Sequence, residues 1–225
     1  MGMGLPLVSV PVLAGFVGVE HAVKIMIIPS VVLNAYPAFT HRAYAGEVPE
    51  LKRILIGALP GALVGAAILQ YASPELLETG LAVWIFLYLG LRLLHPNFRL
   101  TDAFRHTWSP AVGATAGALQ ASTGISAPII APYVDALKLK PESYVFSVCV
   151  CFGSFATAHL LVVLIAGVLD WEVALQGLAA IVPAILFIPI GVRARRLISR
   201  RVFDLIIRTM LLVMGLRLIY AAWAS

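Results

Sequence analysis

The sequence has few charged residues and only two cysteines. Charged side chains make up 12% of its 225 residues, hydrophobic side chains make up 61%, and the mean hydropathy is +0.97. A soluble domain of this length needs far more polar surface around its core, so this composition excludes one. Cys149 and Cys151 lie two residues apart, a spacing that points them to different sides of a helix. We therefore expect no disulfide and no bound metal.

The long apolar runs contain no Asp, Glu, Lys or Arg. Such runs occupy residues 54–71, 111–134, 143–169 and 173–192. Each is long enough to cross a bilayer as a helix, whereas strands of a membrane barrel would be shorter and would alternate. The sequence therefore predicts an all-α polytopic membrane protein with the lipid bilayer as its surroundings. The net charge of +5 comes mostly from loops and segment ends, where topology and lipid headgroups account for it, so no nucleic-acid partner is expected.

We expect seven to eight transmembrane helices, in two homologous repeats. The apolar segments are approximately 5–19, 22–39, 54–71, 76–94, 111–134, 144–169, 173–192 and 202–223. Three landmarks recur in order at spacings of 121, 121 and 125 residues: Pro11 with Pro132, Ala45-Gly46 with Ala166-Gly167, and Gly90-Leu-Arg-Leu-Leu94 with Gly215-Leu-Arg-Leu-Ile219. A nearly constant spacing favours a duplication over chance similarity of apolar helices. The expected division is a first repeat over 1–95, a polar linker over 96–110 and a second repeat over 111–225.

A helix break is expected within residues 122–132. Gly124, Pro128 and Pro132 are poor residues for a continuous helix. A break frees backbone N–H groups, and the half-helix that follows directs its positive end into the gap, which is a favourable place for an anion. The alternative is a proline kink whose free groups are satisfied by neighbouring helices.

The first half has a matching Gly/Pro-interrupted stretch between Gly2 and Pro11. Interrupted segments at matching positions of two halves are the best sequence indication of a transporter site. The substrate-binding hypothesis therefore combines both stretches with two polar residues of other segments: Gly2, Gly4, Ser9, Asn34, Gln120, Ser122, Thr123, Gly124, Ser126 and His159.

Two further patterns concern the interior of the helix bundle. His159 could relay protons, because its unperturbed pKa is close to physiological pH, or it could be a neutral histidine bonded to a neighbouring carbonyl. Gly57, Gly61 and Gly65 repeat at four-residue spacing along one helix face. This spacing predicts close helix packing and no chemistry.

The order of several short motifs resembles the TauE/SafE sulfite exporter family. In the first half these are Val10-Pro-Val-Leu13, Gly18-Val-Glu-His-Ala22, Ala45-Gly-Glu-Val48 and Leu59-Pro-Gly-Ala-Leu-Val-Gly65; in the second they are Ser122-Thr-Gly-Ile-Ser-Ala-Pro128, Leu139-Lys-Pro-Glu142 and Ala166-Gly-Val-Leu-Asp-Trp171. The resemblance implies gradient-driven export of sulfite, sulfonates or related anions. Family members carry more glycines in the two interrupted stretches and have a helix before the first of them. Either the first half has lost this helix or the helix is encoded upstream of Met1, and we expect the second.

The function that these patterns favour is transport of a small anionic solute across the cell (inner or plasma) membrane, without catalysis, cofactor or metal. Homo-oligomerisation stays open. The alternatives are an anion channel, a membrane scaffold that transports nothing, and an intramembrane enzyme. Ser122, Ser126 and His159 supply the residue types of a hydrolase, but no nucleophile motif surrounds either serine. A transporter must show saturable flux, which separates it from an open pore.

Overall fold

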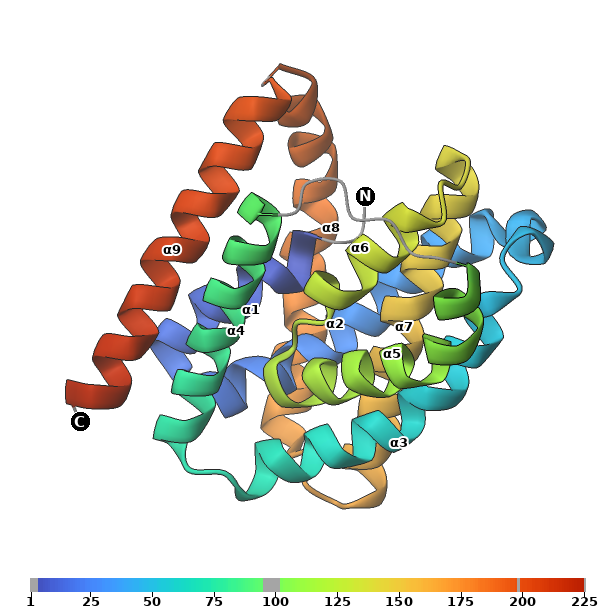
Figure 1. Cartoon of the computed structure of the whole chain (residues 1–225). Helices are drawn as coiled ribbons and strands as arrows, with labels where there is room; N and C mark the ends of the chain where they lie inside the picture. Colours follow the sequence, from blue (N-terminus) through green and yellow to red (C-terminus); the bar gives the residue numbers. More distant parts are fainter. Residues whose placement is uncertain (1–3, 95–101, 198, 225) are drawn as a thin grey trace.

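The computed structural model describes residues 4–94, 102–197 and 199–224, and within these ranges all regular structure is helical. The prediction of an all-α polytopic membrane protein is therefore confirmed. The elements, shown in Figure 1, are α1 (Gly4–Val17), α2 (Val19–Thr40), the 3-10 helix η1 (Arg42–Glu47), α3 (Glu50–Tyr71), α4 (Pro74–Leu94), α5 (Asp102–Thr123), α6 (Ala127–Ala136), α7 (Pro141–Ile165), α8 (Trp171–Leu197) and α9 (Arg200–Ala224).

Five helices of the described part are long and apolar enough to cross a membrane. They are α2, α3, α7, the Trp171–Ile190 part of α8 and the Leu205–Trp223 part of α9, and α1 is a shorter apolar helix. Large apolar side chains point outward from them, such as Ile56 on α3, Leu186 on α8 and Trp223 on α9. An apolar surface of this extent requires lipid around it.

The helices differ from the expected segments at two places. Helix α5 begins at Asp102, so most of the expected linker 96–110 is helical, and residues 95–101 lie outside the described part. Low hydropathy marks where a segment leaves lipid, and a helix can continue past that point. Helix α1 runs through Pro11 without a break and ends at Val17. The chain turns instead at Gly18, whose φ of 80° is a conformation that glycine adopts readily.

The order of the helices agrees with the proposed duplication. Helices α6, α7, α8 and α9 begin 123, 122, 121 and 126 residues after α1, α2, α3 and α4. Helix α5 precedes the second set. We propose on this basis that α1–α4 and α6–α9 are the two repeats.

Helices α3 and α5 pack with their backbones in direct contact. Gly57, Gly61 and Gly65 are buried on one face of α3, and a Cβ atom added to any of them would overlap a backbone carbonyl group of α5. The approach is reciprocal, because glycines of α5 meet carbonyl groups of α3 in the same way. The paired residues are Gly57 with Pro110, Gly61 with Ala114, Gly65 with Ala118, Gly113 with Ile54, and Gly117 with Ala58. The predicted packing role of the α3 glycines is confirmed.

Candidate functional site

The expected helix break lies between α5 and α6, at residues 124–126. Gly124 adopts a φ of 71°, which ends α5. The side chain of Gln120 closes the turn: its Nε2 donates to the carbonyl oxygen of Gly124 at 3.2 Å, and its Oε1 accepts from Ser126 Oγ at 2.7 Å. The break predicted within residues 122–132 is therefore confirmed.

Helices α1 and α4 pack against this break. A Cβ atom added to Gly124 would lie 2.8 Å from Val10 Cγ2 on α1, so the break faces the region between Gly4 and Pro11, as expected. From α4, Trp84 Nε1 donates to the carbonyl oxygen of Ile125 at 3.0 Å. In this turn, the carbonyl group of Ile125 thus accepts a hydrogen bond from Trp84, and Gly124 packs against Val10.

The hydroxyl groups near the break already donate hydrogen bonds to backbone carbonyl groups of α5. Ser122 Oγ donates to the carbonyl oxygen of Ala118 at 2.8 Å, and Thr123 Oγ1 donates to that of Leu119 at 2.7 Å. Thr123 Oγ1 also accepts from the backbone N–H of Ile125 at 3.3 Å. A solute at the break would have to replace these internal acceptors. The part that these residues play in binding stays a prediction.

Replacing Trp84 with phenylalanine should loosen the break. The substitution keeps most of the ring and removes the donor to Ile125, leaving a buried carbonyl without its partner, at a cost of about 1–3 kcal/mol. We expect a lower unfolding temperature for the purified protein in mild detergent. Trp171→Phe is the control, since Trp171 is exposed at the start of α8. Equal unfolding temperatures for the two variants would contradict the proposed role of the indole.

A second set of buried polar residues, in addition to those at the helix break, lies on α2 and α7. Ser30, Asn34 and His159 are 2%, 3% and 1% exposed. Asn34 Nδ2 donates to the carbonyl oxygen of Ser30 at 2.7 Å, but Ser30 Oγ, Asn34 Oδ1 and His159 Nε2 have no hydrogen-bond partner in the described structure. Buried polar atoms left unpaired are costly, which indicates a place for water, a proton or a solute.

The helices that carry the two sets of polar residues are in contact with one another. Helices α2, α5 and α7 all contact one another. Asn34 and His159 were expected from the sequence, whereas Ser30 was missed because a lone serine in an apolar helix usually bonds to its own backbone. Of the remaining expected residues, Ser9 is half-buried on α1, Gly4 begins that helix, and Gly2 lies outside the described residues.

Lys24 was also missed. Its side chain is 11% exposed, and its Nζ atom lies 2.7 Å from Glu20 Oε1, one helical turn earlier on α2. A lysine five residues inside an apolar helix, with a glutamate at i−4, was the available signal.

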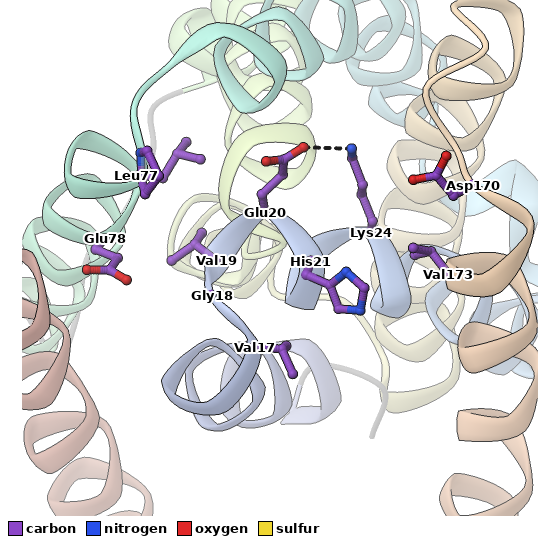
Figure 2. Close-up of a pocket in the computed structure, with 11 residues that line it drawn as sticks. Val17, Gly18, Val19, Glu20, His21, Lys24, Leu77, Glu78, Asp170 and Val173 are labelled. Atoms are coloured by element: carbon purple, nitrogen blue, oxygen red, sulfur yellow. Dashed lines mark hydrogen bonds and ion pairs between the residues drawn. The ribbon is translucent and has the colours of Figure 1, made fainter.

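A pocket of about 290 Å³ opens beside Lys24, where α1 meets α2. Figure 2 shows the Glu20–Lys24 pair between Glu78 of α4 and Asp170 before α8. His21 also lines the pocket, and its Nε2 atom is 2.8 Å from Gln176 Oε1 of α8.

A second pocket, of about 360 Å³, shares Gly18 and Glu78 with the first and extends toward Arg217 on α9. The Arg217 guanidinium donates to the carbonyl oxygen of Gly15 near the end of α1 and lies 4.9 Å from the centre of the Phe16 ring. Together the two pockets surround the turn between α1 and α2 with charged side chains.

Comparison with known proteins gave one match. A family model described as sulfite exporter TauE/SafE matches residues 1–218, which include every residue discussed above except those near the C-terminus. Neither the curated proteins nor the solved structures gave a match. The matched range agrees with the resemblance that the sequence motifs indicated over nearly the whole chain.

Proposed function

Because the chain belongs to the TauE/SafE sulfite exporter family, a family of membrane transporters, we propose that it exports sulfite, sulfonates or other small anions across the cell (inner or plasma) membrane. The protein is a multi-pass membrane protein, and its family points away from enzymatic activity. The choice of an anion as solute is the part of this proposal that rests on the interior of the protein.

The charge of the buried polar residues is the observation that carries this choice. Among the residues whose burial is described, Lys24 is buried and no Asp or Glu is. A site for a cation in lipid normally needs a buried acid or a ring of carbonyl groups, whereas an anion needs a cation and hydrogen-bond donors. The other buried polar side chains carry hydroxyl, amide or imidazole groups: Ser30, Asn34, Ser109, Gln120, Ser122, Thr123, Ser126, Ser143, Ser147 and His159.

The geometry argues against the intramembrane hydrolase. A serine nucleophile needs a base within hydrogen-bonding reach. Ser122 Oγ and Ser126 Oγ donate instead to the carbonyl oxygen of Ala118 and to Gln120, and His159 Nε2 has no partner in the described structure. Neither serine hydroxyl therefore has His159 as its hydrogen-bond partner in the described structure.

Flux from proteoliposomes tests the proposed function. We expect sulfite to leave loaded vesicles at a rate that saturates with sulfite concentration, and sodium and potassium flux to stay at the level of protein-free vesicles. The physical reason is that the buried polar residues offer an anion one positive charge and neutral donors. Cation flux without anion flux would contradict the proposal. Anion flux that rises linearly without saturation would indicate a channel.

A further inference from the structure

Lys24 has a position that packing alone does not require. It lies five residues after Val19, about 8 Å along the axis of α2 at 1.5 Å per residue. A lone ammonium group at that depth is costly, and the Glu20 carboxylate offsets its charge. The two partners are buried to different extents, because the Lys24 side chain is 11% exposed and that of Glu20 is 48% exposed. Glu20 can therefore turn to water, whereas Lys24 stays inside.

The pocket reaches this ion pair from outside. Glu20 and Lys24 both line the pocket of about 290 Å³. A water molecule occupies about 30 Å³ in the liquid, so an oxyanion of four heavy atoms fits there together with several waters. Figure 2 shows the ion pair between helices α4 and α8, with the Lys24 ammonium joined to Glu20. A solute in the pocket can thus reach the ammonium group, and it also meets the carboxylates of Glu78 and Asp170, which line the same pocket.

Lys24 shares helix α2 with two other buried polar side chains, Ser30 and Asn34. On the neighbouring helix α7, His159 is 1% exposed, and its Nε2 has no partner in the described structure. Helices α2 and α7 pack against each other along the face that also includes Asn34. Lys24 thus lines the pocket and lies on the same helix as the unpaired polar atoms of Ser30 and Asn34.

From this arrangement we propose that Lys24 binds the anionic solute, and that Glu20 is an internal carboxylate which the solute displaces. This inference rests on the proposed function. The exchange replaces one anionic partner of the ammonium group with another, so that group is paired both before and after the solute binds. In the empty protein Glu20 keeps the buried lysine neutralised. The long flexible stem of lysine allows the ammonium group to follow the bound anion inward.

If Glu20 and the solute compete for Lys24, substitutions of the two residues should change the KM for sulfite in opposite directions. Glu20→Gln removes the competing carboxylate, so we expect the KM for sulfite to fall by about threefold or more. Lys24→Gln removes the charge that holds the anion, so we expect the KM to rise by about tenfold or more. Lys24→Arg keeps the charge and should lie nearer to the wild type than Lys24→Gln. The measurement is initial sulfite efflux from proteoliposomes in gluconate buffer, since chloride would compete.

The chain contains a matched control pair. Lys140 Nζ lies 3.4 Å from Glu47 Oε1, with side chains 71% and 40% exposed, and neither residue lines the two pockets. Lys140→Gln and Glu47→Gln should leave the KM unchanged, because they remove the same charges from an exposed pair outside the proposed path.

Direct binding separates this inference from the proposed function. We expect sulfite to raise the unfolding temperature of the purified wild type and of Lys140→Gln, but not of Lys24→Gln. If the wild type carries sulfite and Glu20→Gln, Lys24→Gln and Lys24→Arg all keep its KM, the ion pair is only a structural contact within α2 and the inference is overturned. If the wild type shows neither sulfite flux nor stabilisation by sulfite, the proposed function and the inference both fail. Stabilisation of the wild type without flux, lost in Lys24→Gln, would support the binding role and contradict transport of sulfite.

Discussion

Replacing Gly61 with leucine is expected to separate α3 from α5 and to leave little folded protein. An added Cβ at this position overlaps the carbonyl group of Ala114, which belongs to the α5 backbone and cannot turn aside as a flexible side chain can. Overpacking in a core typically costs about 1–3 kcal/mol, and an obstacle made of backbone puts this substitution at or above the upper end of that range. The measurement is the yield of monodisperse protein in mild detergent, together with its unfolding temperature.

The control for this prediction is Gly80→Leu on α4. Gly80 is exposed, and no atom lies within 4 Å of a Cβ added there. Leucine is also a better helix former than glycine, so Gly80→Leu should express and unfold like the wild type. If Gly61→Leu were as stable as Gly80→Leu, the α3–α5 contact would not have the close backbone approach described above.

The positions of the helices could be predicted from hydropathy, because lipid selects apolar residues along a whole segment. Which helices pack against one another could not be predicted in this way. The spacing of Gly57, Gly61 and Gly65 indicates a close contact, but any neighbouring helix with small residues could have supplied it. The choice of α5 depends on Gly113 and Gly117, which meet the α3 backbone in return. The start of α5 at Asp102 was missed because hydropathy reports contact with lipid and does not report helix formation.

The location of the candidate site could be predicted from the sequence. The hydrogen bonds within it could not. Gly124 and the prolines around it indicated the break, since few other residues end a helix there. Gln120 and Ser126 lie six residues apart and meet only because α5 ends between them. The sequence therefore identified a set of donors for an anion, whereas in the structure those donors close the turn. Lys24 differs, because its position in the sequence indicated an ion pair with Glu20, whereas the extent of its burial depends on the helices around α2.

The substitution Gly124→Val is expected to reduce anion flux by about tenfold or more while the protein still inserts in the membrane. Two effects act at this position. The φ of 71° is strained for a residue with a side chain, at a cost of about 1–2 kcal/mol. The added Cβ also lies 2.8 Å from Val10 Cγ2, so α1 must move away from the break. The measurement is sulfite efflux per inserted protein, with insertion determined from the amount recovered in sealed vesicles.

Gly167 allows the two effects to be separated. Its φ is 65°, close to that of Gly124, but no atom lies within 4 Å of a Cβ added there. Gly167→Val therefore carries the backbone strain without the contact, and we expect it to lose stability and keep most of its flux. The pair Gly124→Ala and Gly124→Ala with Val10→Ala tests the contact itself, because the smaller residue 10 makes room for the new methyl group and should restore part of the flux. Unchanged flux in Gly124→Val, or equal losses in Gly124→Val and Gly167→Val, would mean that the contact between α1 and the break has no part in transport.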